Sequence, residues 1–121
     1  MALQKNTELT IMVNNLIETH EPAHPLEQIR AAAEAGHIVY GGRKVGNDIR
    51  NLGYALEDVA RCVAGLREAH YKKTFTYQDT DTVFDAYERK FEHKGRIDTV
   101  YMKLRLLPGG IVYISVGSFH L

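Results

Sequence analysis

The stretch "TVYMKLRLLPGGIVYISV", residues 99–116, decides the fold, because its apolar side chains recur at every second position on both sides of a turn. This alternation is typical of strands that each bury one face. On the first strand the apolar face holds Val100, Met102, Leu104 and Leu106, and the other face holds Tyr101, Lys103 and Arg105. "PGG" at 108–110 supplies the turn. The sequence therefore predicts a C-terminal β-hairpin with a basic, tyrosine-bearing open face.

The register of this hairpin follows if Leu107 pairs with Ile111 across the turn. The cross-strand pairs are then Arg105 with Tyr113, Lys103 with Ser115 and Tyr101 with Gly117. Beyond that point, simple alternation buries His120 and exposes Phe119. A β-bulge at Gly117 would reverse both, turning Phe119 inward and His120 outward.

"HYKKTFTYQD", residues 70–79, predicts a further strand ending at polar turn formers. Alternation places Tyr71, Lys73, Phe75 and Tyr77 on one face and Lys72, Thr74 and Thr76 on the other. Two interpretations of Lys72 stay open: a solvated lysine on a half-buried strand, or a cation that faces an anion. "VFDAYERKF", residues 83–91, fits a helix face or a strand, and we favour the strand.

The first half of the chain has helical periodicity. We expect an amphipathic helix over 7–19, and further helices within 25–36, 41–53 and 55–66, with "HIVY" (37–40) a short strand or an extended linker. The apolar stripe of the first helix needs a partner: its own domain, a second copy or another protein. We favour its own domain, because short connections join spatial neighbours. The fold class is α+β.

Composition narrows the function. A chain of 121 residues fits one domain. Its single cysteine, Cys62, excludes an internal disulfide, and its six histidines show no metal-ligand spacing. Zero net charge argues against an indiscriminate nucleic-acid binder, although residues 61–121 carry a net +3 against −3 for residues 1–60. No signal peptide or membrane-length apolar run is visible, so we expect a cytoplasmic protein without membrane contact.

The element order and three motifs resemble the MqsR family of toxin ribonucleases, which act on messenger RNA in bacterial toxin–antitoxin pairs. "HPLEQIRAAAEAGHI" (24–38) is similar to the family's opening helix. "YK" (71–72) followed by "TYQD" (76–79) is similar to its central motif, and "VYMK" (100–103) to its penultimate strand. The resemblance covers residues 23–121 and rests on the order and spacing of the motifs.

This resemblance implies a RelE-like fold, in which N-terminal helices pack on a twisted antiparallel sheet that ends in a C-terminal β-hairpin and binds RNA on its open face. It divides the chain into a helical extension, 1–22, and a ribonuclease domain, 23–121. The family's cleavage residues fall on Lys72 and Tyr101. It also implies a cognate MqsA-like antitoxin, a separate protein with a zinc-bearing portion and a DNA-binding portion.

The sequence departs from the family pattern at two positions. A family glutamine falls at Phe84, and a late-strand lysine falls near Gly117 or, with a bulge, near His120. The resemblance says nothing about residues 1–22. These departures leave a second class of function open, a non-catalytic nucleic-acid-binding regulator or inhibitor module that uses the same basic face.

Metal-independent cleavage of single-stranded mRNA needs a proton acceptor, charge stabilisation on the phosphorane and a proton donor. Lys72 and Arg105 are candidates for the charge. Tyr101 can orient the 2′-hydroxyl, or act as base if nearby cations lower its pKa. His120, if exposed, suits acid or base work. We expect no cofactor or metal, and RNA binding by Lys73, Tyr77, Lys103 and Tyr113.

Each candidate also has a purely structural interpretation. Lys103 and Arg105 suit a solvated strand face, and His120 suits an exposed chain end. Tyr101 can simply cover apolar neighbours, and Tyr77 can belong to the core. The three-dimensional arrangement of these side chains therefore decides how far they form one site.

Overall fold

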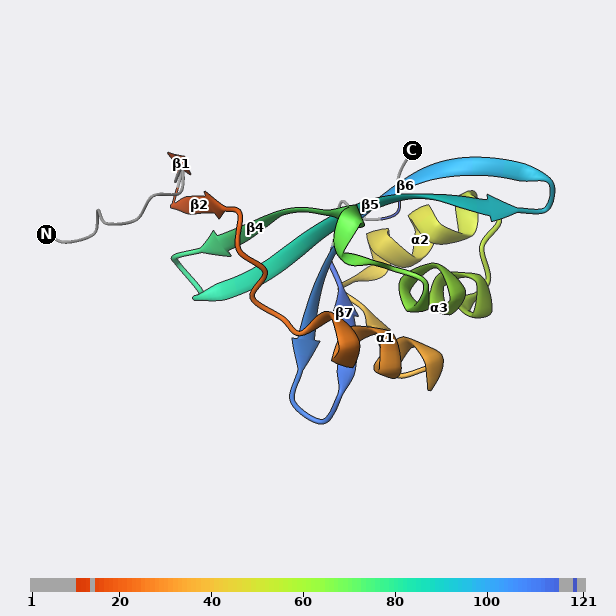
Figure 1. Cartoon of the computed structure of the whole chain (residues 1–121), viewed down its shortest axis with the longest axis horizontal. Helices are drawn as coiled ribbons and strands as arrows, with labels where there is room; N and C mark the ends of the chain where they lie inside the picture. Colours follow the sequence, from red (N-terminus) through yellow and green to blue (C-terminus); the bar gives the residue numbers. More distant parts are fainter. Residues whose placement is uncertain (1–10, 14, 116–118, 120–121) are drawn as a thin grey trace, which may run out of the picture.

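A seven-stranded sheet runs through the computed structural model, which describes residues 11–13, 15–115 and 119 (Figure 1). In chain order the elements are β1 (Ile11–Val13), β2 (Leu16–Thr19), α1 (Leu26–Glu34), β3 (Ile38–Tyr40), α2 (Arg43–Asn51), α3 (Leu56–Ala64), the 3-10 turn η2 (Glu68–His70), β4 (Tyr71–Tyr77), β5 (Thr82–His93), β6 (Arg96–Leu107) and β7 (Ile111–Ile114). The strand order is β1-β2-β4-β5-β6-β7-β3. Among the strands of the described residues, only β3 and β7 pair in parallel. This arrangement confirms the α+β prediction and is consistent with a RelE-like fold.

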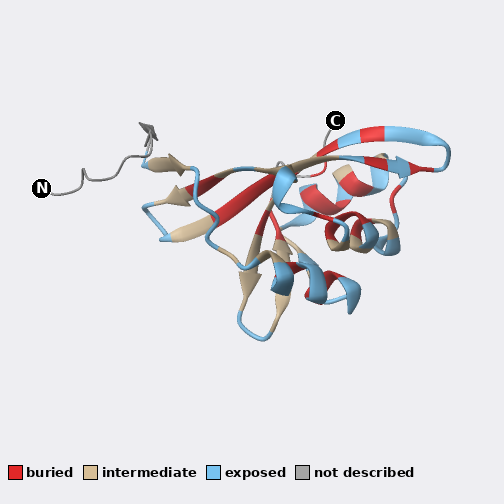
Figure 2. Ribbon diagram, in the orientation of Figure 1, coloured by how far each residue is buried: buried red, intermediate tan, exposed pale blue. Residues whose placement is uncertain are grey.

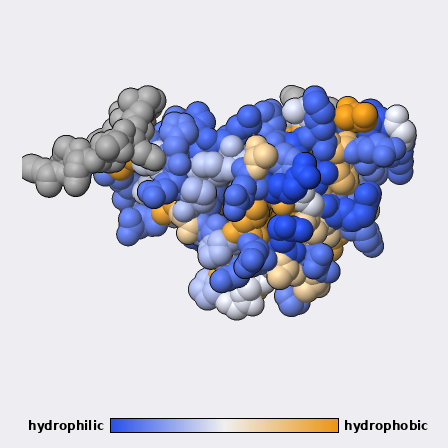
Figure 3. All heavy atoms as spheres, viewed as in Figure 1, coloured by the Kyte–Doolittle hydropathy of each residue, from blue (hydrophilic) through white to orange (hydrophobic). Residues whose placement is uncertain are grey.

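The three helices pack on one face of the sheet (Figure 1). Their buried side chains meet those of the central strands, and Figure 2 shows the buried stretches along both layers. The core includes Ile29, Ala33, Val45, Ile49, Val59 and Val63 from the helices and Tyr87, Met102, Leu104, Val112 and Ile114 from the strands. Burial of each large apolar side chain contributes about 1.5–3 kcal/mol. The face of the molecule drawn in Figure 3 is mostly hydrophilic, with small separate hydrophobic areas.

The predictions for residues 25–66 and 83–91 are confirmed. Helices α1, α2 and α3 occupy the three predicted ranges, "HIVY" contains strand β3, and 83–91 lies in strand β5. The predicted hairpin register is also present, with Leu107 opposite Ile111 and Arg105 opposite Tyr113. The local sequence pattern is enough to predict the hairpin register, because a tight turn fixes which residues face one another.

At the end of the hairpin, Ser115 and Phe119 are the described residues that test the predicted register. Ser115 N donates to Lys103 O, as the register predicts, but Tyr101 O accepts from Phe119 N. Phe119 is fully buried and has a φ of 56°. The inward orientation of Phe119 is therefore confirmed. Gly117 and His120 lie outside the described residues.

The predicted helix over 7–19 is wrong. The described part of this range forms strands β1 and β2, and β2 continues the sheet by pairing with β4. Asn15, with a φ of 66°, occupies the left-handed conformation that suits the turn between them. Gln78 N donates to Asn15 O across to β4, and Leu16 pairs with Tyr77. The apolar residues of this segment have a spacing that fits a helix but also fits a strand. Pairing with the edge of β4, which would otherwise be uncovered, favours the strand.

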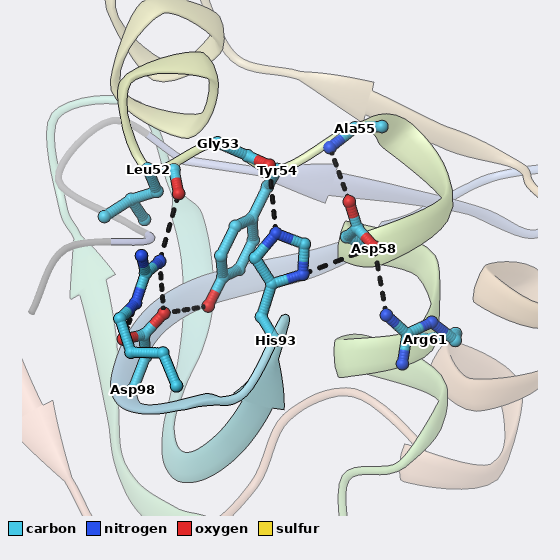
Figure 4. A network of polar contacts seen from close by, with 9 residues as sticks. Leu52, Gly53, Tyr54, Ala55, Asp58, Arg61, His93 and Asp98 are labelled. Carbon is cyan, nitrogen blue, oxygen red and sulfur yellow. Dashed lines mark hydrogen bonds and ion pairs between the residues drawn. The ribbon is translucent and has the colours of Figure 1, made fainter.

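A polar network fastens the β5–β6 hairpin to the connection between α2 and α3 (Figure 4). The Tyr54 hydroxyl donates to the buried Asp98 carboxylate at 2.7 Å. Arg96 Nε also donates to Asp98 at 2.7 Å. On the other side of the Tyr54 ring, His93 Nε2 donates to Gly53 O, and its Nδ1 lies 3.6 Å from Asp58 Oδ1. These contacts are structural, since each polar group is engaged inside the network.

We expect Asp98→Asn to lower stability and to change its dependence on pH. The Arg96 hydrogen bond, and then that of Tyr54, hold the pKa of Asp98 below its ordinary value. Because the unfolded carboxyl binds protons more readily, this stabilisation is present above about pH 4 and is lost as pH falls through the folded pKa. Removing hydrogen bonds to a charged group costs about 1.5–3 kcal/mol. Urea unfolding at pH 7 and pH 3 measures it; the same deficit at both values would contradict the prediction.

Candidate nucleic-acid interface

The sheet face opposite the helices, here called the open face, carries a mixed set of basic and aromatic side chains. Cross-strand pairing places residues of β2, β4, β5, β6 and β7 on it. They include Glu18, Lys73, Phe75, Tyr77, Phe84, Ala86, Glu88, Tyr101, Lys103, Arg105, Tyr113 and Ser115. A basic groove with aromatic side chains is the usual surface for single-stranded nucleic acid.

Lys72 joins this face through a β-bulge. Tyr71 pairs with Tyr87, but Lys73 pairs with Ala86, so one extra residue lies between them on β4. The Lys72 side chain is 49% exposed, and its Nζ lies 3.7 Å from Glu88 Oε1 on the open face. The two consecutive lysines therefore reach the same side of the sheet.

The bulge corrects the predicted alternation on β4. Lys72 was expected to share a face with Thr74, but Thr74 is buried on the helix side of the sheet. Its hydroxyl donates to Asp85 Oδ1 at 2.6 Å. Asp85 also accepts from the backbone N–H groups of Ala23 and His24. This buried carboxylate holds the segment before α1 against the sheet and is not available for catalysis.

Two lysines lie over aromatic rings on the open face. Lys103 Nζ is 5.3 Å from the Phe75 ring centroid and donates to the Tyr77 hydroxyl at 3.2 Å. Lys73 Nζ is 5.4 Å from the same Phe75 ring and 3.2 Å from Glu18 Oε1. Cation–π contacts of this kind hold ammonium groups near rings that can stack on bases.

Arg105 lies between two rings. Its guanidinium carbon is 5.1 Å from the Tyr113 centroid and 5.9 Å from that of Phe84. Its Nε is buried and has no hydrogen-bond partner among the described residues. The side chain borders a shallow hollow of about 330 Å³ that is also lined by Tyr77 and Ser115. Arg105 therefore adds a positive charge to the lining of this hollow, which favours an anion there.

Tyr101 is opposite Glu88, the residue that pairs with Lys72. Burial raises the pKa of the Tyr101 phenol, and Tyr77, Glu18 and Glu88 raise it further. The condition for a tyrosine base, a pKa lowered by nearby cations, is therefore not met. The phenol stays protonated at neutral pH and can donate a hydrogen bond.

The structure gathers the predicted site residues into two groups. Glu88 connects Lys72 with Tyr101, whereas Arg105 pairs with Tyr113. Arg105 lies four residues beyond Tyr101, about 13 Å along the strand. The structure therefore does not bring Lys72 and Arg105 to one point. His120, the fourth predicted catalytic residue, lies outside the described residues.

Among the open-face residues named above, four with charged or aromatic side chains were missing from the sequence-based set: Phe75, Phe84, Glu18 and Glu88. Phe75 and Phe84 are cross-strand partners beneath the cations. Glu18 comes from the strand that was expected to be a helix. Counting alternate positions from a correct β4–β5 register would have identified all but Glu18.

Three further features are absent from the described part of the chain: a cluster of metal ligands, a helix that could span a membrane and a reactive thiol. No three His, Cys, Asp or Glu side chains there are grouped to hold a metal ion. None of its helices has the length and apolar character of a membrane span. Burial raises the pKa of the Cys62 thiol to about 12, so that thiol is not a nucleophile at neutral pH.

Comparison with known protein families supplies a match. A family model described as "Motility quorum-sensing regulator, toxin of MqsA" matches residues 21–119. No curated protein matches the chain. Of the open-face residues named above, the matched range contains all except Glu18, which precedes it.

Proposed function

The chain belongs to the family of the motility quorum-sensing regulator, toxin of MqsA, and from this premise we propose that it is a metal-independent endoribonuclease that cleaves mRNA. Family membership makes it the toxin of a toxin–antitoxin pair. The observation that carries the catalytic proposal is the bulge in β4, which brings Lys72 next to Glu88, the cross-strand partner of Tyr101, on a basic, aromatic sheet face.

The proposed reaction uses the RNA's own 2′-hydroxyl as nucleophile. Its oxygen forms a bond to the adjacent phosphorus while the bond from phosphorus to the 5′-oxygen breaks. The 2′-proton leaves, the 5′-oxygen gains a proton, and the products are a 2′,3′-cyclic phosphate and a 5′-hydroxyl. The protein has to orient the hydroxyl and stabilise the negative charge that builds on the non-bridging oxygens.

Lys72 is suited to stabilise that charge. It is half exposed and held on the open face by a 3.7 Å ion pair that a phosphate can replace at little cost. Tyr101 donates a hydrogen bond from its protonated phenol and positions the ribose or phosphate beside Lys72. The role of His120 as a proton donor or acceptor stays a prediction.

The remaining cations and rings bind the RNA on either side of the bond that is cut. Lys73 and Lys103 face the backbone, and Tyr77 and Tyr113 offer rings for stacking. Because Arg105 lies about 13 Å along the strand from Tyr101, it serves an adjacent nucleotide in this proposal. Its guanidinium faces the hollow between Tyr113 and Phe84.

The family description names an antitoxin partner. We propose that the antitoxin of this chain is an MqsA-like protein encoded separately, with a zinc-bearing portion that grips the toxin and a portion that binds DNA. The toxin then acts in the cytoplasm, where its mRNA substrate is found. Co-purification with a small neighbouring protein is the expected result when the two are expressed together.

Purified protein incubated with single-stranded RNA and EDTA tests the proposed activity. We expect cleavage that persists in EDTA and leaves 2′,3′-cyclic phosphate ends. The Lys44→Ala variant, which removes an exposed lysine on α2, controls for general loss of charge. RNA binding without cleavage would instead identify a non-catalytic regulator that uses the same face, the alternative favoured by Phe84 at a glutamine position.

A further inference from the structure

A second basic hollow lies beyond the open face, at the free edge of β5. Strand β4 begins opposite Tyr87, so the rest of β5 has only β6 as a described sheet neighbour. The turn η2 lies against this edge (Figure 1). Between them is a hollow of about 590 Å³, lined by Gly65, Arg67, His70, Glu88, Arg89, Lys90 and Thr99.

The charges of this hollow are unbalanced. Arg67, Arg89 and Lys90 line it together with one acid, Glu88. That acid already lies 3.7 Å from Lys72 Nζ. Within the described ranges, none of the ion pairs involves the three cations of the hollow. An anion entering the hollow would therefore meet cations that no acid neutralises.

Arg89 is held in position without a carboxylate. Its Nη1 donates to Cys62 O at 2.9 Å, and its Nε donates to Lys90 O at 3.1 Å. A Cβ at position 65 would collide with Nη1, so Gly65 allows this close approach. The guanidinium is thus oriented by backbone carbonyls and keeps its full positive charge for a ligand.

His70 adds a neutral donor to the same hollow. Its Nδ1 accepts a hydrogen bond from Arg67 N at 2.9 Å, so the ring proton resides on Nε2. Burial, together with Arg89 and Arg67, lowers the pKa of His70. The ring is therefore neutral at pH 7 and offers Nε2–H as a hydrogen-bond donor.

We propose that this hollow binds a phosphodiester of the RNA substrate, adjacent to the one that meets Lys72. This inference rests on the proposed ribonuclease function. Glu88 belongs both to the hollow and to the Lys72 ion pair, so a strand that crosses the open face at Lys72 continues directly into the hollow. A phosphodiester shares one negative charge between two non-bridging oxygens, and both oxygens can accept hydrogen bonds from the guanidinium, ammonium and N–H donors of the hollow.

The test is RNA affinity as a function of salt, measured by fluorescence anisotropy. The probe is a single-stranded RNA of about ten nucleotides with methylated 2′-oxygens, which cannot be cleaved. We compare the wild type with Arg67→Gln/Lys90→Gln and with a matched control, Arg43→Gln/Lys44→Gln on α2. Both pairs of side chains are exposed, so thermal midpoints should stay the same.

We expect the hollow variant to bind about tenfold more weakly at low salt. Its slope of log affinity against log salt should be shallower by about 0.7 for each phosphate that the variant no longer neutralises, with the control like the wild type. Equal affinity and slope in all three proteins would overturn the inference even if the RNA is cleaved. Weaker antitoxin binding with unchanged RNA binding would also overturn it and assign the hollow to the protein partner. Wild-type binding with the expected slopes but no cleavage of unmethylated RNA would refute the ribonuclease proposal alone.

Discussion

The Lys72→Ala variant should be harmless in a bacterial host in which the wild-type toxin stops growth. If Lys72 stabilises the charge of the phosphorane, its loss should lower the RNA cleavage rate constant by about 10²–10³-fold. The thermal midpoint should move by no more than a few degrees, because an exposed ion pair contributes about 0–1 kcal/mol. Growth curves, cleavage of a fluorescent RNA and thermal unfolding measure the three effects.

Lys44 offers a matched control for this experiment. It is exposed and pairs with Asp48 at 3.2 Å, as Lys72 pairs with Glu88, but it lies on α2 away from the open face. Lys44→Ala should therefore retain full toxicity. A Lys72→Ala protein that remains as toxic as the wild type would remove Lys72 from the mechanism.

The parts of the fold that local patterns specify were predicted from the sequence. Alternation on β6 and the "PGG" turn fixed which side chains face each other, so the pairing of Arg105 with Tyr113 could be predicted. The three helices could be predicted as well, since each combines an apolar stripe with a stop signal such as Gly36 or Gly53. In both cases neighbours in sequence determine the structure.

The N-terminal hairpin depends instead on a distant partner. Residues 16–19 form a strand because β4 offers an edge whose N–H and C=O groups need pairing. The sequence of residues 7–19 alone does not indicate that such an edge is present. The short apolar pattern fits a helix and a strand equally well, and the tertiary pairing decides between them.

The candidate site shows the same division. Tyr101, Lys103 and Arg105 were placed on one face by counting along a regular strand. Lys72 was expected on the polar face, but it was wrongly grouped with Thr74 and apart from Lys73, because a bulge depends on how β4 pairs with β5 and has no sequence signal here. One extra residue on β4 thus brings Lys72 to Glu88, on the same face of the sheet as Tyr101.

Tyr101→Phe separates two roles for the second proposed catalytic residue. The phenol is protonated at neutral pH, because burial and then Tyr77, Glu18 and Glu88 raise its pKa above the ordinary value. If this hydroxyl orients the ribose or the phosphate, removing it should lower the rate constant at saturating RNA about 10²-fold. RNA affinity should change little, because the ring that can stack on a base remains.

The pH profile distinguishes a hydrogen-bond donor from a base. A base must lose its proton before it acts, so activity would rise with pH toward the phenol's pKa; a donor works only while protonated and loses activity above that pKa. With the pKa raised above 10, the Tyr101 contribution should therefore be constant from about pH 6 to pH 9, and the ratio of wild-type to variant rates should not vary. Tyr40→Phe on β3 is the control, since burial also raises the pKa of that tyrosine outside the open face. A rate ratio that climbs tenfold per pH unit would make Tyr101 the base, and a ratio near one at every pH would leave only its ring in the mechanism.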